Sequence, residues 1–187
     1  VVGGGITGAL TSHALVEKGY KVTLIDKRDI GQGSSSATTS MLQYEIDVPL
    51  SELSTMIGAY AAAQCYKAGI EAINKLGQLV KENKIDCGFE KKESLYIAHN
   101  EEAAQSLYEE FEIRNKCQLG VKWLKPEEIL KIYGLKSFGG ILSQTAASVD
   151  AYKLAHELIH YNVKRGMTVC DQTELKDFDF SAEKPII

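Results

Sequence analysis

The residues best suited to chemistry stand at the start of the chain, in the segment Gly3-Gly4-Gly5-Ile6-Thr7-Gly8. This segment fits the pattern G-x-G-x-x-G. In such a loop the first glycine permits a tight turn, the second lets the backbone approach a pyrophosphate, and the third lets the following helix pack closely. The N–H groups and the dipole at the start of that helix then face the phosphates. We therefore expect a dinucleotide-binding loop.

The flanking residues predict the strand, helix and strand that such a loop requires. Two β-branched residues precede the loop, and an apolar stripe with helical spacing follows it: Ile6, Leu10 and Ala14. Gly19 stands where a helix end favours a left-handed residue, and residues 21–26 are typical of a buried strand. Asp26 ends that strand near the spacing at which an acidic side chain accepts hydrogen bonds from an adenosine ribose. The order of elements supports dinucleotide binding over a mere tight turn.

Small hydroxylated residues follow this unit, after Lys27 and Arg28. They form the run Ser34-Ser35-Ser36-Ala37-Thr38-Thr39-Ser40-Met41-Leu42. Such residues can approach a phosphate or a flat ring closely and donate hydrogen bonds, which suits a long extended cofactor. The alternative interpretation is a solvated Ser/Thr linker.

Together, the glycine loop, the acid followed by basic residues and the hydroxyl run resemble one superfamily of FAD-dependent oxidoreductases. It contains D-amino acid oxidase, glycine oxidase and glycerol-3-phosphate dehydrogenase. Near the end of the chain, residues 139–142, 148–150 and a helix to Gly166 look like the return to the FAD domain. Residues 173–175 look like a strand whose backbone meets the adenine.

The resemblance implies a role for each matching position. The pyrophosphate would lie against Gly3, Gly5, Ile6, Thr7 and Gly8, and the ribose against Asp26. The remaining cofactor residues would be Lys27, Arg28, Ser34, Ser35, Ser36, Thr38, Thr39, Ser40, Met41, Leu42 and, through its backbone, Leu175. Ser40 departs from the family, since many relatives have glycine there. The histidine that some relatives use for covalent attachment is absent, so we expect non-covalent FAD.

The resemblance also implies a fold class and an activity. The fold would be α/β, with a Rossmann-like FAD-binding domain in residues 1–85 and 148–187 and part of an α+β antiparallel substrate domain in residues 86–147. The reaction would be oxidation of a D-amino acid, of glycine or a sarcosine-like amine, or of glycerol 3-phosphate. No catalytic residue is assigned, and because relatives continue further we expect this chain to be inactive alone. An NAD-type dehydrogenase and a nucleotide-binding regulatory module without turnover remain as alternatives.

The middle of the chain predicts mixed helices and strands. We expect one helix over residues 47–83, with Ser51 as its cap and an apolar stripe formed by Leu53, Ile57, Ala61 and Cys65. Strands are expected over 88–90, 94–98 and 121–124, and a further helix from Pro126. A helix over 101–116 is expected to begin at Asn100 and to bury Leu107 and Phe111 beneath a solvated charged face.

One segment, His156-Glu157-Leu158-Ile159-His160, matches the zinc motif H-E-x-x-H. On a helix, however, both histidines fall opposite the apolar face, and the sequence offers no third histidine at the extended-motif spacing. A solvated helix face is therefore favoured over a zinc hydrolase, and we predict no metal site.

Composition excludes several other classes. The chain has 187 residues, of which 44% are hydrophobic and 25% charged, and its formal net charge is −4. The sequence has no dense block of Lys and Arg that would suggest nucleic-acid binding, and no apolar run approaches the roughly 18 residues of a membrane span.

Four cysteines without a C-x-x-C pair predict reduced thiols in a cytoplasmic protein. A start at Val1 without an initiator Met predicts truncation. The expected partner is a small-molecule substrate, and homo-oligomerisation is left open.

Overall fold

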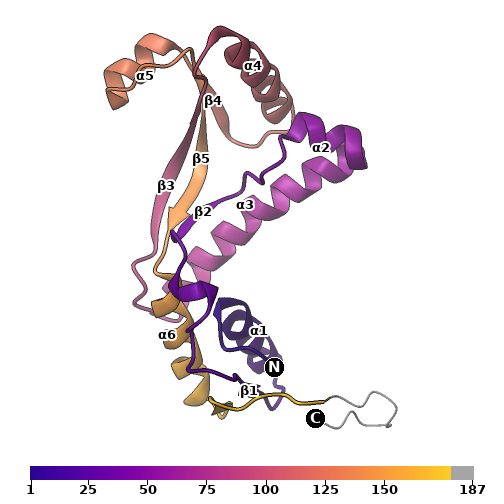
Figure 1. The fold of residues 1–187 in the computed structure, drawn as a ribbon, viewed down its shortest axis with the longest axis vertical. Helices are drawn as coiled ribbons and strands as arrows, with labels where there is room; N and C mark the ends of the chain where they lie inside the picture. The colour runs from indigo at the N-terminus through magenta and orange to yellow at the C-terminus, as the bar shows by residue number, and fades with distance from the viewer. Residues whose placement is uncertain (178–187) are drawn as a thin grey trace. The chain divides into compact units, whose positions relative to one another are not determined.

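The computed structural model describes residues 1–177, which divide into two compact units. The first unit contains Val1–Ser40, Glu82–Gly88 and the described residues from Val149 onward. The second contains Met41–Lys81 and Phe89–Ser148. Figure 1 labels the helices and strands of both units. Among residues 1–177, no helix combines the length and the apolar character needed to cross a membrane.

A short parallel sheet with two helices forms the first unit. Its elements are α1 (Ile6–Glu17), β1 (Thr23–Ile25), the 3-10 turn η1 (Ser34–Ser36), α6 (Ala151–Val163) and β6 (Thr168–Cys170). Strand β1 pairs in parallel with β6, and Val2 forms a parallel bridge with Ile25. Helix α1 packs against α6 (Figure 1). The predicted helix and second strand are therefore present, whereas the strand expected ahead of the glycine loop is reduced to the single bridge at Val2.

Helix α1 ends as its sequence predicts. Gly19 has φ +81°, and its N–H donates to Val16 O at 2.9 Å while the N–H of Tyr20 donates to Leu15 O at 3.1 Å. These two bonds satisfy carbonyl groups that the helix end leaves without intrahelical partners. The chain is thereby turned toward β1.

Two details of the first unit differ from the sequence-based expectation. The buried residues of α1 are Ala9, Ser12 and His13, not the expected stripe. The reason is α6, since His13 Nδ1 lies 3.1 Å from Asn162 Oδ1 and that polar pair is buried between the helices. Residues 173–175 are not a strand. The strand that pairs with β1 is β6 instead, whose β-branched residues Thr168 and Val169 favour strand pairing.

An antiparallel sheet with helices forms the second unit. Its elements are β2 (Met41–Gln43), α2 (Leu50–Ile57), α3 (Ala59–Glu82), β3 (Glu90–Ile97), α4 (Glu101–Lys116), β4 (Val121–Leu124), α5 (Pro126–Tyr133) and β5 (Gly140–Ser148). Strand β5 is central: β3 pairs along one edge, while β2 and β4 share the other (Figure 1). The predicted strand over 121–124 is confirmed as β4, whereas the strands predicted over 88–90 and 94–98 form one strand, β3, which begins at Glu90.

Local sequence also determines where two of these helices begin. The side chain of Asn100 accepts a hydrogen bond from Ala103 N at 2.7 Å, which caps α4 at the predicted residue. Helix α5 begins with Pro126 and has a capping box in which Glu128 Oε2 accepts from Lys125 N at 2.8 Å. Both starts follow from side chains within three residues of the helix end.

The single helix expected over residues 47–83 is wrong, because the chain breaks at Gly58. This residue has φ +88°, which a continuous helix does not allow. Because of this break, the residues that α3 buries are not the ones that continue the apolar spacing of α2. Cys65 and Ile57 are exposed, whereas the buried residues of α3 are Ala62, Ala63, Tyr66, Ile73 and Val80. Ser51 does not cap α2 either, since a side chain from α4 takes that role.

Candidate functional site

The glycine loop of the first unit, residues 3–8, packs so closely against the start of α1 that Gly8 has no room for a side chain. Gly3 has φ +101°, and a Cβ added to Gly8 would lie 1.8 Å from Gly3 O and 2.9 Å from Gly3 C. Backbone atoms cannot give way as a flexible side chain can. The third glycine of the motif is therefore required by the close contact between the loop and the first turn of α1, and the first glycine is required by its positive φ.

The start of α1 is open to an anion. Gly5 occupies the cap position and has no side chain to bond the first turn, which also contains no acidic residue. Ser35, which is buried, supplies one partner, because its Oγ accepts from Ile6 N at 2.9 Å. The structure thus brings the hydroxyl run against the glycine loop. The helix dipole and the remaining N–H groups favour negative charge here.

The carboxylate of Asp26 lies beside this loop. Its Oδ2 accepts from Gly4 N at 2.7 Å, and its Oδ1 accepts from Arg28 N at 2.8 Å. Partial burial opposes ionisation, but these two hydrogen bonds and the charges of Arg28 and Lys27 outweigh it, so the net pKa of Asp26 is lowered. Each oxygen of an ionised carboxylate retains a second acceptor position, which suits the hydroxyls of a ribose.

Local hydrogen bonds hold several of the other expected cofactor residues of the first unit. Ser36 Oγ donates to Gly33 O at 2.8 Å, and Thr38 Oγ1 accepts from Ser40 N at 3.1 Å. Leu175 is half-buried, and its segment is held near Asp26 because Thr173 N donates to Asp26 O at 2.7 Å. The exposed ones are Thr7, Lys27, Arg28, Ser34, Ser36, Thr38 and Thr39.

Two expected cofactor residues belong to the second unit instead. Met41 and Leu42 lie in β2, where they pair with Ser148 and Ala147 of β5. Gly4 was not among the expected cofactor residues, because it occupies an unspecified position of the motif, yet its N–H donates to the Asp26 carboxylate.

Ser40 has φ +62°, the left-handed region that favours glycine. We expect Ser40→Gly to raise the free energy of unfolding by about 0.5–1 kcal/mol, since relief of roughly 1–2 kcal/mol of backbone strain exceeds the entropic cost of glycine. Urea denaturation measures this. Thr39→Gly is the control, because Thr39 is exposed and lacks a positive φ, so glycine there is expected to destabilise. A loss of stability in both variants would contradict the prediction.

A buried ion pair lies in the second unit, on the helix whose charges were expected to be solvated. The Arg114 and Glu110 side chains are only 2% and 4% exposed, and Nε donates to Oε1 at 2.6 Å. Glu110 also accepts from Leu50 N and Ser51 N, each at 2.8 Å, and so caps α2. The expectation of a wholly solvated charged face is therefore wrong. Leu107, Glu110 and Arg114 share a helical stripe, and that spacing was the available signal.

The surroundings of Glu110 and Arg114 favour the charged form of both side chains. Burial acts to raise the pKa of Glu110, but its hydrogen bonds with Ser51, Arg114 and Leu50 outweigh that effect and the net pKa is lowered. Burial opposes the charge of Arg114 as well, yet the bond with Glu110 leaves the net pKa of Arg114 raised. The Arg114 guanidinium lies 5.3 Å from the ring centre of Tyr66, and burial raises the pKa of that phenol to about 12.

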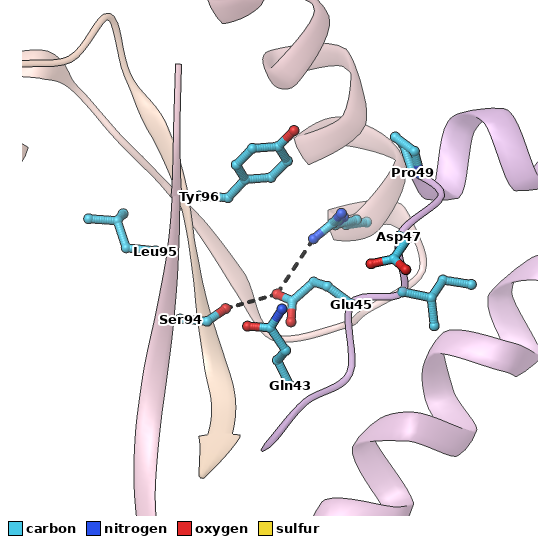
Figure 2. A pocket seen from close by; sticks show the side chains of 9 residues that line it. Gln43, Glu45, Asp47, Pro49, Ser94, Leu95 and Tyr96 are labelled. Atoms are coloured by element: carbon cyan, nitrogen blue, oxygen red, sulfur yellow. Dashed lines mark hydrogen bonds and ion pairs between the residues drawn. The ribbon is translucent and has the colours of Figure 1, made fainter. Parts of the chain in front are cut away.

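Glu45 extends the charged cluster from the chain after β2. Its Oε1 lies 3.6 Å from Arg114 Nη1 and accepts a hydrogen bond from Ser94 Oγ at 3.0 Å, as the dashed lines in Figure 2 mark. Ser143 also donates to this oxygen through a short hydrogen bond. Residues from β3, β5 and α4 thus meet at one carboxylate.

The H-E-x-x-H segment lies in α6. His156 Nε2 is 2.9 Å from Ile30 O, and the ring of His156 packs on Tyr152 with centroids 4.4 Å apart. His156 is half-buried, contrary to the expected solvated position, while His160 is exposed. Across residues 1–177, no group of three His, Cys, Asp or Glu side chains is placed to hold a metal ion.

Sequence comparison gives two curated relatives of this chain. It is 30% identical over 185 residues to "Putative Rieske 2Fe-2S iron-sulfur protein YhfW" of Bacillus subtilis (strain 168), covering 99% of this chain and 35% of that protein. It is 27% identical over 181 residues to a glycine oxidase of Geobacillus kaustophilus (strain HTA426), covering 95% of this chain and 46% of that enzyme. The chain therefore spans less than half the length of each.

Solved structures of similar fold include a glycine oxidase from Geobacillus kaustophilus, with a TM-score of 0.80 at 24% identity over 98% of this chain and 49% of that one. An L-α-glycerophosphate oxidase from Mycoplasma pneumoniae with FAD bound has a TM-score of 0.74 at 22% identity, over 95% of this chain and 45% of that one. These likenesses confirm the mixed α/β fold.

The family model DAO, described as FAD dependent oxidoreductase, matches residues 1–185. The chain therefore belongs to the DAO family of FAD-dependent oxidoreductases.

Proposed function

We propose that the protein to which this chain belongs oxidises a small amine or amino acid, or glycerol 3-phosphate, with non-covalent FAD as hydride acceptor. The observation that carries the proposal is the geometry of the glycine loop, where a helix start with only Ser35 bonded to its first N–H lies beside Asp26, whose pKa is lowered. The relatives named as glycine oxidase and glycerophosphate oxidase support both substrate classes.

The residues of the loop fit FAD. A helix start whose cap residue is glycine and whose first turn has no acidic residue suits a pyrophosphate, and the close contact of Gly8 with Gly3 leaves a surface of bare backbone. Asp26 would hold the ribose hydroxyls, and Ser35 would keep the loop in place through its bond with Ile6 N. The run of residues 34–42 contains neither His nor Cys, which supports non-covalent binding.

FAD supplies the two-electron acceptor of the reaction, and the protein positions it. In this chain, Asp26 would orient the adenosine end, because its carboxylate is itself held by Gly4 and Arg28. The first turn of α1 would neutralise the phosphates.

The absorbance spectrum of purified protein, before and after denaturation, tests the proposal. We expect bands near roughly 370 and 450 nm that pass into the soluble fraction on denaturation, as non-covalent flavin requires. A colourless protein that does not take up added FAD would overturn the proposal. If its melting temperature then rises with NAD, the NAD-type dehydrogenase is favoured.

Asp26→Asn is expected to raise the Kd for FAD about 10- to 100-fold, since a charge-assisted hydrogen bond contributes about 1.5–3 kcal/mol. Asparagine has a single acceptor oxygen, so its amide nitrogen would meet the N–H of either Gly4 or Arg28. Fluorescence titration of apoprotein with FAD measures the change. Asp29→Asn is the matched control, because Asp29 is exposed and lies three residues away. Equal affinities in the two variants would sink the assignment of the ribose to Asp26.

For domain organisation, we propose an FAD-binding domain formed by the two ends of the chain, with residues 86–147 as part of a substrate domain. The first compact unit, which joins Val1–Ser40 to the described residues from Val149, supports the pairing of the two ends, whereas Met41–Lys81 belong to the second unit together with Phe89–Ser148. The four cysteines form no disulfides, which supports a reducing compartment such as the cytoplasm.

A further inference from the structure

The first histidine of the H-E-x-x-H segment, His156, contacts the stretch of chain between β1 and η1. Its Nε2 lies 2.9 Å from the carbonyl oxygen of Ile30. Because a carbonyl oxygen can only accept a hydrogen bond, Nε2 must carry a proton and donate it. The half-buried ring of His156 thus fixes one backbone carbonyl of this stretch to α6.

The same part of α6 leaves no room for a side chain on the residue after Ile30. Gly31 has φ +77°, and a Cβ added to it would lie 2.9 Å from Tyr152 Cδ2 and 3.1 Å from His156 Nε2. The rings of Tyr152 and His156 pack on each other and so form one surface. Residues 30 and 31 are therefore held on two side chains of α6 by a hydrogen bond and by close packing.

Gly31 in turn contacts the glycine loop. Its N–H donates to Gly4 O at 3.1 Å, and the N–H of Gly4 donates to Asp26 Oδ2 at 2.7 Å. The side chain of Ile30 packs beneath the same loop, because a Cβ added to Gly4 would collide with its Cδ1. A continuous series of contacts thus runs from the imidazole of His156 to the carboxylate proposed to hold the ribose.

We propose that His156 is a positioning residue of the FAD site, acting through Ile30 and Gly31. By fixing these two residues, its N–H keeps Gly4 in the place from which it orients the Asp26 carboxylate. A binding loop that is ordered before its ligand arrives binds more tightly, because less conformational entropy is lost on binding. The inference rests on the proposed function and adds to it a residue of α6, outside the glycine loop and the hydroxyl run.

Two substitutions separate the hydrogen-bond donor from the ring. His156→Phe keeps a flat ring beside Tyr152 and removes the N–H, so we expect the Kd for FAD to rise about 3- to 10-fold. His156→Gln places an amide N–H near the position of Nε2 and should keep the Kd within about twofold of the unchanged chain. His160→Phe is the matched control, since His160 is exposed one turn further along α6, and its Kd should not change. A loss in His156→Gln equal to that in His156→Phe would overturn the role of the donor.

Gly31→Ala tests the contact from the other side. The new methyl group would press on Tyr152 and His156, so we expect the Kd for FAD to rise about 10-fold or more. Gly19→Ala is the control, because Gly19 also has a positive φ, +81°, but no atom of the described residues lies within 4 Å of an added Cβ. It introduces backbone strain without the contact and should leave the Kd within about twofold. Equal affinities in the two glycine variants would contradict the proposal.

Hydrogen exchange of the full chain without FAD separates this inference from the proposed function. In His156→Phe, the amides of residues 3–8 and 26–33 should exchange about 3- to 10-fold faster than in the unchanged chain, and His156→Gln should restore slow exchange. Residues 10–17 of α1 are the internal reference, because a general loss of stability would speed their exchange equally and would count against a positioning role.

The two measurements fail independently. If exchange at the loop responds to His156→Phe but the unchanged chain takes up no FAD, the proposed function is wrong and the hold of His156 on the loop stands. If the unchanged chain binds FAD but neither exchange nor the Kd responds to His156→Phe, the positioning role of His156 is refuted.

Discussion

Gly8→Ala is expected to lower the free energy of unfolding by about 3 kcal/mol or more and to abolish FAD uptake. The new Cβ would lie 1.8 Å from Gly3 O, a backbone atom that no change of side-chain rotamer can move. Overpacking in a well-packed region costs about 1–3 kcal/mol and occasionally more, and this contact is far inside van der Waals distance. Urea denaturation together with FAD titration measures both effects.

Gly5→Ala separates binding from folding at the same loop. A Cβ at Gly5 would lie 3.1 Å from Ser35 Oγ, a side-chain atom that can shift by a few tenths of an ångström. We therefore expect a stability change within about 1 kcal/mol but a large loss of FAD affinity, because the methyl group would meet the pyrophosphate. If Gly5→Ala took up FAD normally, the phosphates would not lie on this loop.

Glu110→Ala is expected to destabilise the chain by about 3–5 kcal/mol, since it leaves the buried charge of Arg114 without its partner. It also removes the cap of α2, because the carboxylate accepts from Leu50 N and Ser51 N. The double variant Glu110→Leu with Arg114→Met is expected to recover only part of this loss, because it removes the unpaired charge of Arg114 but leaves Glu45, whose side chain is 13% exposed, without its cation. Chemical denaturation of the single and double variants gives the comparison.

The control is a second ion pair with the same helical spacing. Lys75 and Glu71 of α3 lie 2.6 Å apart, the distance found for Arg114 and Glu110, but their side chains are 71% and 63% exposed. Glu71→Ala should lower the free energy of unfolding far less than Glu110→Ala does, because solvent screens exposed pairs. Similar losses in Glu71→Ala and Glu110→Ala would show that burial of the pair contributes nothing.

The same carboxylate makes stability depend on pH in the acid range. Because the pKa of Glu110 in the folded protein is lowered from its ordinary value of 4.5, its contribution is present above that value. The contribution is lost as the pH falls through the lowered pKa of the folded state. Between pH 7 and pH 3, the Glu110→Ala variant should therefore lose less stability than the unchanged chain. A steeper acid loss in the variant would contradict this.

Local features of the structure followed from the sequence because their causes lie within a few residues. The strand, loop and helix around Gly3–Gly8, the left-handed Gly19 and the cap at Asn100 all depend on short-range sterics and hydrogen bonds. The Ser/Thr run was predicted to lie near the cofactor, and that assignment stays a prediction, although Ser35 does reach Ile6 N.

Tertiary structure alone decided which polar residues are buried and which strands pair. Glu110 becomes a helix cap because Leu50, 60 residues away in the chain, presents its N–H to it. Strand β6 replaces the expected strand at residues 173–175 because β1 offers its open edge to Thr168–Cys170. The sequence by itself determined the family's nucleotide loop, whose geometry is local. Burial and pairing depend on partners brought together from distant parts of the chain, and periodicity within one segment does not specify them.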